Sequence, residues 1–185
     1  MSWKVDNAHT SLEFSARHMM VSTVRGHFDR FSGEVEIDPD DLSKSWATAE
    51  IEAASVDTRE EARDTHLRSA DFFDTEQFPL ITYRSGKIES RGGNRYRVEG
   101  ELTIKGVTRP LDLEVELLGM EPSPFGFKVA GFEARGSLSR KDFGLNWNLA
   151  LETGGWLVGD EIKLRIDAEA DEVVEQLQAA GAASA

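Results

Sequence analysis

Four histidines are the residues of this sequence whose side chains lend themselves most readily to chemistry: His9, His18, His27 and His66. Their spacing matches neither the H-x-H nor the H-E-x-x-H pattern of common zinc sites, so we expect no metal site. The chain has no cysteine, which excludes a thiolate nucleophile, and no serine stands in a G-x-S-x-G turn. The sequence therefore gives little support to an enzyme, and we expect none.

A short cluster of Arg63, Asp64 and His66 has two readings. Together with His18 it could serve a hydrolase that acts on an amphiphilic substrate. Alternatively, Arg63 and His66 contact the polar head of a bound ligand, and Asp64 ties a helix to the rim of a barrel by charge-assisted hydrogen bonds. His18 shares a strand face with Phe14, where it is either a head-group contact or a hydrogen-bonded core residue.

Composition excludes several classes of protein. The 185 residues suit one domain, and the net charge of -13 repels phosphate backbones, so we expect no nucleic acid partner. No apolar run approaches the roughly 20 residues that span a bilayer, so we expect no stable membrane insertion. The opening residues, MSWKVD, lack the pattern of a secretory signal, so we expect a cytoplasmic location. The composition does not decide whether the protein forms a homodimer.

Alternation of apolar and polar residues recurs along most of the chain, which is typical of strands with one buried face. The clearest case is LDLEVEL at 111–117, and about eight such segments are separated by short turns. Short connections favour antiparallel order. The sequence therefore predicts an all-β fold, an eight-stranded antiparallel β-barrel of the lipocalin-like kind.

Three segments depart from this alternation. The apolar positions change parity between Val24 and Ile37 and again between Val129 and Phe132, which predicts bends or bulges. At Thr58, the sequence TREE reads as a capping box that opens a helix, with Thr58 as the N-cap. This helical insert lies between the third and fourth strands. With the segment 139–159, which has no strong element of its own, it is expected to cover one end of the barrel.

Small residues on the expected inner faces bear on whether the barrel is hollow. They are Gly26, Gly33, Ala47, Ala49, Ala53, Gly100, Ala134, Gly136 and Ala168. An eight-stranded barrel is either filled by its own side chains or, where these are small, wide enough for one slim ligand. From the residues alone, an apolar lumen and a packed core with glycines at bends are equally supported.

Six motifs in order resemble those of the YceI-like family of polyisoprenoid-binding proteins. They are WKVDNAHTSLEF at 3–14 with His18, GHF at 26–28, SVDT at 55–58, RDTHL at 63–67 with FF at 72–73 and FP at 78–79, GELTIKGVT at 100–108, and RKDFGL at 140–145. The resemblance runs from about Trp3 to Glu169, and we expect the barrel to span residues 1–170. From the residues that follow, we expect a tail over 171–185 that is partly helical or disordered.

What the resemblance implies is the binding of a long-chain isoprenoid or similar lipid in the lumen, without a cofactor, by a carrier, store or sequestering protein. Many members of the family are exported to the periplasm. This chain differs from them in its opening residues, which lack the pattern of a secretory signal. A solid barrel that acts as an interaction module is the remaining alternative. The side chains expected to contact the ligand are Phe14, His18, Phe28, Ala49, Ile51, Arg63, His66, Leu67, Phe72, Phe73, Tyr83, Gly100, Leu102, Ile104, Phe132, Phe143 and Trp147.

Overall fold

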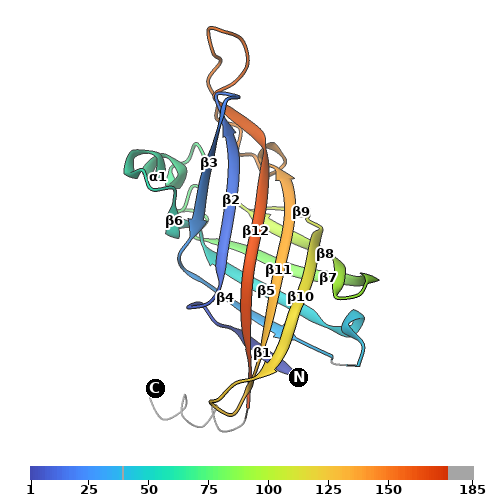
Figure 1. Ribbon diagram of the computed structural model, residues 1–185. Coiled ribbons are helices and arrows are strands. Elements are labelled where there is room, and N and C mark those ends of the chain that lie inside the picture. The colour runs from blue at the N-terminus through green and yellow to red at the C-terminus, as the bar shows by residue number, and fades with distance from the viewer. Residues whose placement is uncertain (39, 175–185) are drawn as a thin grey trace, which may run out of the picture.

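The computed structural model describes residues 1–38 and 40–174 (Figure 1). The strands are β1 (Ser2–Val5), β2 (Ser11–His18), β3 (Ser22–Phe28), β4 (Phe31–Glu36), β5 (Trp46–Glu52), β6 (Val56–Asp57), β7 (Leu80–Gly92), β8 (Arg95–Ile104), β9 (Val107–Pro110), β10 (Leu113–Pro122), β11 (Lys128–Ser139) and β12 (Val158–Glu172). The helix α1 spans Glu61–Arg68, and three 3-10 turns are η1 (Leu42–Lys44), η2 (Ala53–Ser55) and η3 (Arg140–Phe143). Among the described residues, no helix has both the length and the apolar character to cross a membrane.

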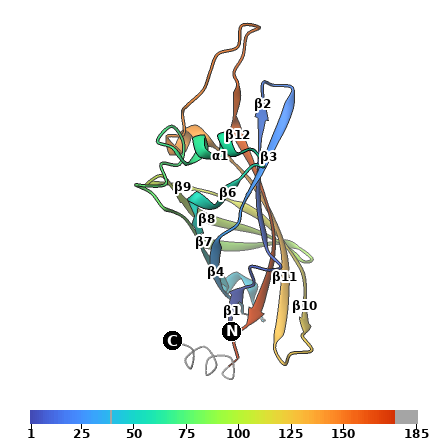
Figure 2. The same ribbon diagram turned by 90° about the vertical axis from the view of Figure 1, so that its left-hand side faces the viewer.

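The strands close into a barrel. The ring β1-β4-β5-β7-β8-β10-β11-β12 has eight antiparallel strands, and it closes because β1 pairs with both β4 and β12. Strands β2, β3 and β6 continue the sheet from the same edge of β12 that β1 occupies, with β2 pairing next to β1 along that edge and β11 on the opposite edge. Figures 1 and 2 show a tall barrel with the N-terminus at its lower end and α1 at its upper end. The predicted eight-stranded barrel with a helical insert is confirmed.

The longest strand, β12, shows why alternation predicts this wall. Its residues Ile162, Leu164 and Ile166 face the lumen, and they pair with Ala16, Phe14 and Leu12 of β2. On its other side β12 pairs with β11 from Val129 to Ser139. Cross-strand apolar pairs of this kind are the unit that stabilises a sheet.

Each predicted change of parity lies beside an irregularity in strand pairing, although the second irregularity is in the neighbouring strand. At the first, the chain leaves β3 at Phe28 and enters β4 at Phe31, where it exchanges β2 and β6 as neighbours for β1 and β5. At the second, the register of β10 and β11 slips between Leu117 and Gly119. The bulge therefore lies at Leu118 of β10, which has no partner between the pairs Leu117–Phe132 and Gly119–Gly131, rather than in β11.

The predicted N-cap of the helix is wrong. Glu60 is the N-cap, and its carboxylate accepts hydrogen bonds from the backbone N–H groups of Ala62 and Arg63. The hydroxyl of Thr58 is unavailable because it donates to the Asp64 carboxylate and accepts from the Arg63 guanidinium. A carboxylate at the start of the helix is also favoured by the helix dipole.

The barrel ends later than predicted. Asp171 and Glu172, assigned to the tail, belong to β12 and pair with Lys4 and Trp3 of β1. The N–H of Val173 then donates to the carbonyl of Ser2. The rest of the expected tail, from position 175, lies outside the described residues.

Two buried clusters occupy the interior. The larger contains Ile81, Leu102, Leu111 and Phe143 with their apolar neighbours. A smaller one at the lower end combines Trp3, Ile37, Ala130 and Ala170 with the half-buried Val35, Leu42 and Phe132. Beside these clusters, side chains leave two cavities inside the barrel.

Candidate ligand site

An apolar cavity of about 500 Å³ occupies the upper part of the barrel. Aliphatic side chains of β2, β7, β8 and β12 form its wall, and α1 contributes Ala62 and Leu67. Phe72, Phe73 and Trp147 come from the connections at the upper end. A concave, mostly apolar space with a few polar groups at one end is the usual form of a small-molecule site.

A second cavity, of about 220 Å³, lies toward the lower cluster and shares five wall residues with the first. These five residues, which we call the waist, are Leu12, Ala49, Tyr83, Leu113 and Ile166. Leu12 pairs with Ile166 across β2 and β12, and Ala49 pairs with Tyr83 across β5 and β7. The two cavities therefore follow one another along the lumen and share part of their wall at the waist.

Tyr83 is the one residue of the waist with a polar side-chain atom. Its hydroxyl is buried, and it has no hydrogen-bond partner among the described residues. Burial and, to a lesser degree, the charge of Asp112 raise the pKa of Tyr83 to about 12, so the phenol is neutral. The hydroxyl lies against Gly100, because a Cβ at that glycine would come within 2.2 Å of it.

The expectation that glycines leave room for a ligand is wrong at Gly26, Gly100 and Gly136, which line neither cavity. A Cβ at Gly26 would collide with the ring of Phe14, one at Gly33 with Val5, one at Gly100 with Tyr83, and one at Gly136 with Leu113. Each glycine therefore makes room for a neighbouring side chain of the wall. The lower cavity is lined by Gly33 and by Ala47, Ala49, Ala134 and Ala168.

Most of the residues expected at the ligand lie on the lumen. The upper cavity is lined by Phe14, His18, Phe28, Ala49, Ile51, Arg63, His66, Leu67, Phe72, Phe73, Tyr83, Leu102, Ile104 and Trp147. Phe132 lines the lower cavity only. Gly100 and Phe143 line neither, because Tyr83 covers the first and the second is packed within the larger buried cluster.

Polar groups gather at the upper end of the lumen. The Arg63 guanidinium lies on the cavity wall, where it donates to the hydroxyl and the carbonyl of Thr58. His66 packs edge-on against Trp147, and its Nε2 lies 2.9 Å from a carboxylate oxygen of Asp71. Asp64 is buried and accepts from the N–H and the hydroxyl of Thr58, which directly follows β6. The expected tie between helix and barrel is therefore formed by Asp64.

Arg140 is a residue of this end that sequence reasoning missed. It is buried, and its guanidinium donates to the carbonyls of Leu145, Trp147, Val158 and Gly159 and to the carboxylate of Asp160. Burial lowers the pKa of this guanidinium from its ordinary value. The segment 139–159, expected to lack a strong element, is thus fastened at its base by Arg140 and η3. The available signal was an arginine between an apolar strand and a glycine turn.

The wall residues of β2 and β12 were also absent from the predicted contacts. Leu12, Ala16, Ile162, Leu164 and Ile166 all line the upper cavity. Their strict alternation in the sequence was the signal that would have identified them.

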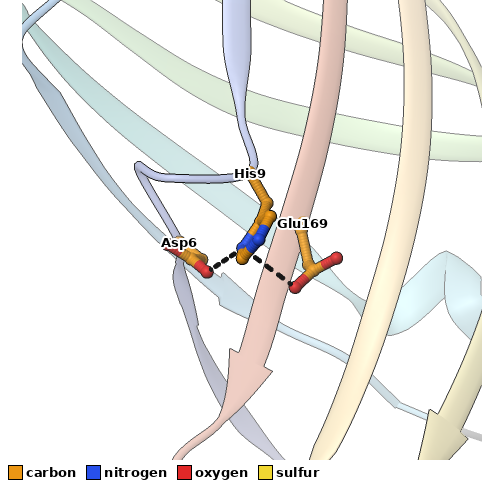
Figure 3. Close-up of side chains that lie close together, drawn as sticks. All are labelled: Asp6, His9 and Glu169. Carbon is orange, nitrogen blue, oxygen red and sulfur yellow. Dashed lines mark hydrogen bonds and ion pairs between the residues drawn. The ribbon is translucent and has the colours of Figure 1, made fainter.

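A polar cluster outside the lumen joins the lower strands (Figure 3). His9 Nδ1 lies 2.6 Å from Asp6 Oδ2 and 3.6 Å from Glu169 Oε1. The hydrogen bond to Asp6, with the charges of Asp6, Glu169 and Asp171, raises the pKa of His9, and the bond to His9 lowers the pKa of Asp6. Burial, together with the charges of Asp6 and Glu169, raises the pKa of Asp171. The three side chains of Figure 3 are close enough to share a cation, and histidine spacing alone did not reveal them.

The pair of His9 and Asp6 predicts a pH-dependent contribution to stability. Because the pKa of His9 is raised on folding, His9 stabilises the fold fully below its unfolded pKa of 6.5. This stabilisation is lost as the pH rises through the folded pKa. Because the pKa of Asp6 is lowered on folding, Asp6 stabilises the fold fully above its unfolded pKa of 3.8. This stabilisation is lost as the pH falls through the folded pKa. We therefore expect His9→Gln to lower the unfolding temperature most between pH 3.8 and pH 6.5, where both contributions are present. Thermal unfolding of both proteins over a pH series measures this, and a difference independent of pH would contradict it.

Comparison with known proteins identifies relatives of this barrel. The family model of the YceI-like domain matches residues 3–170. A UPF0312 protein of Staphylococcus aureus strain N315 is 44% identical over 165 residues, which cover 89% of this chain and 94% of the relative. The crystal structure of BcnA from Burkholderia cenocepacia superposes with a TM-score of 0.76 at 26% identity, covering 89% of this chain and 98% of that one. A polyisoprenoid binding domain from Saccharophagus degradans shares the fold with a TM-score of 0.67 at 14% identity, covering 92% and 98%.

Proposed function

Because the chain belongs to the YceI-like family, we propose that its barrel binds a long-chain polyisoprenoid or a similar amphiphilic lipid in the lumen. The observation that carries this proposal is the succession of two apolar cavities that meet at the waist. The structural neighbour from Saccharophagus degradans, described as a polyisoprenoid binding domain, supports the same class of ligand. The protein would act as a carrier, store or sequestering protein for this lipid.

The shape of the lumen favours a long, slim tail. Each buried methylene contributes up to about 0.8 kcal/mol before the cost of ordering the chain is subtracted. A compact ligand would fill one cavity and leave the other empty, whereas a linear tail that passes the waist contacts both. The tail therefore gains the most when it lies along the barrel axis.

The polar head would lie at the upper end. Arg63, His18 and His66 line the cavity there, and Arg63 forms no ion pair within the described residues. Its guanidinium is free to donate a further hydrogen bond toward an anionic or carbonyl-bearing head. Binding is thus tail first, with the head beside α1.

The hydrolase alternative is less well supported by the contacts of the same residues. The carboxylate of Asp64 is taken up by Thr58, and Nε2 of His66 by Asp71. Within the described part of the chain, no serine or threonine hydroxyl donates to either ring nitrogen of His18 or His66. A nucleophile with an oriented base, which acyl transfer requires, is not assembled from these groups.

Native mass spectrometry of protein purified without detergent tests the proposal. We expect a fraction of the molecules to carry an added mass that is released by organic solvent and identified as a lipid, and the extracted protein to take up a polyprenol supplied in its place. A bare mass both before and after incubation with polyprenol would refute a lumenal lipid and favour a protein that acts through its outer surface.

A further inference from the structure

Five large apolar side chains are exposed at the upper end of the barrel, where two connections project beyond the strands (Figures 1 and 2). They are Met19, Met20 and Val21 in the β2–β3 turn, and Leu149 and Trp156 in the β11–β12 connection, and they are between 45% and 80% exposed. We call this group the apolar tip. It accounts for five of the eleven large apolar residues that are exposed in the described part of the chain.

The two connections form one surface. The N–H of Met19 donates to the carbonyl of Leu157 at 2.8 Å, and the side chain of Met20 lies directly against Gly155. Ala150 and Trp156 are joined by a β-bridge across the second connection. The apolar tip is therefore held in place by backbone contacts, and its side chains remain outside.

The backbone of the β2–β3 turn is a reason to regard the methionines as functional. Met19 and Met20 have φ angles of 50° and 61°, in the left-handed region. Two consecutive residues of this kind make a hairpin turn that asparagine and glycine adopt readily, while a side chain such as methionine disfavours it. The fold alone would be better served by Asn-Gly, and the methionines, which are 45% and 69% exposed, gain only part of the stabilisation that full burial would give.

The charge of the tip differs from that of the whole protein. Residues 17–25 and 145–158 contain Arg17, Arg25 and a single acid, Glu152, which gives +2 − 1 = +1 with histidine neutral, in a chain of net charge -13. Neither arginine forms an ion pair within the described residues. Apolar side chains beside unpaired arginines suit the boundary between the phosphates and the acyl chains of a bilayer.

The apolar tip adjoins the upper end of the lumen, which we call its mouth. Arg17, His18, Leu157 and Val158, which adjoin the exposed residues in sequence, line the upper cavity. On the proposed function, on which this inference rests, the ligand is an amphiphile whose tail is itself dissolved in a bilayer. A site that docks at the bilayer would bring the mouth to the place where the ligand resides.

We infer that the apolar tip docks on the surface of a lipid bilayer, so that the tail of the ligand passes between membrane and lumen beside the β2–β3 turn. The tip inserts apolar side chains among the lipids, and Arg17 and Arg25 contact phosphates. The acidic remainder of the protein favours a zwitterionic surface over a strongly anionic one.

The test is flotation of the full-length protein with phosphatidylcholine vesicles. We expect the double variant Met19→Asn, Met20→Gly to bind vesicles on the order of tenfold more weakly. Its stability toward urea should be equal or higher, because the new residues suit the turn. Phe125→Ser, which removes an 82% exposed apolar residue of the β10–β11 hairpin at the lower end, is the matched control and should float like the parent.

Loading of a polyprenol from detergent, followed by native mass spectrometry, separates this inference from the proposed function. If the double variant loads normally from detergent and fails to float, the docking role stands. If the parent does not float, if the double variant floats equally well, or if Phe125→Ser is equally impaired, docking by the tip is refuted even where the lumen binds lipid. A concentration-dependent dimer that the double variant abolishes would instead assign the tip to a second copy of the chain.

Discussion

Exchange of Ala49 for phenylalanine is expected to abolish the retention of long-tailed lipids while the barrel stays folded. Ala49 belongs to the waist, where its side chain lines both cavities. A ring at this position would close the passage and deny a tail the burial of several methylenes in the lower cavity. With about 0.8 kcal/mol for each methylene, we expect a loss of affinity on the order of 100-fold for long tails. Short tails, which occupy the upper cavity alone, should lose less.

The stability of the same variant separates a hollow barrel from a solid one. Enlarging a side chain in a packed core costs about 1 to 3 kcal/mol, whereas filling an existing cavity is nearly neutral. Glu50→Phe, on the exposed face of the same strand, is the control for a new ring in β5. Binding measured with prenols of graded length, and unfolding of the lipid-free proteins, decide the matter. A large fall in the unfolding temperature of Ala49→Phe would refute the lumen.

The second large effect is expected from Arg140→Met. The guanidinium satisfies four backbone carbonyls and one carboxylate, and its side chain is only 3% exposed. Without it these carbonyls lose their donors in a region that water does not easily reach. We expect a loss of about 3 kcal/mol in the free energy of unfolding, together with faster amide exchange from Gly144 to Gly159.

Lys141→Met provides the comparison for this variant. Lys141 pairs with the same carboxylate, that of Asp160, but its side chain is half exposed. Such a pair contributes at most about 1 kcal/mol. Urea unfolding of both variants measures the difference, and equal losses would show that the carbonyl contacts of Arg140 do not hold the segment.

The architecture was predictable because it follows from local periodicity. Alternation along β2, β10 and β12 identifies walls with one apolar face, and short turns leave little choice but antiparallel order. Details that depend on contacts between distant residues were not predictable. Thr58 has the sequence context of an N-cap, yet Asp64 and Arg63 occupy its hydroxyl, and Glu60 caps the helix instead.

The candidate site shows the same division. The inward face of each strand predicts most of the lumen, including His18 and Phe14. Which glycine leaves space depends on the rotamer of a cross-strand neighbour, as Tyr83 over Gly100 shows, and sequence does not reveal rotamers. The role of Arg140 depends on carbonyls up to nineteen positions away, so the motif RKDFGL at 140–145 does not by itself reveal it.

The pairing of the first strand with the last has a consequence for how the protein is made. Trp3 lies opposite Glu172, so the ring cannot close until nearly the entire domain has left the ribosome. Until then β2 and β1 have an unpaired edge, of the kind that attracts other chains. Contacts so distant in sequence also slow folding, since the entropy of closing the long loop is lost before the pairing is gained. A partly synthesised domain therefore has no complete lumen in which to hold a lipid, and capture of the ligand must follow synthesis and folding of the whole domain.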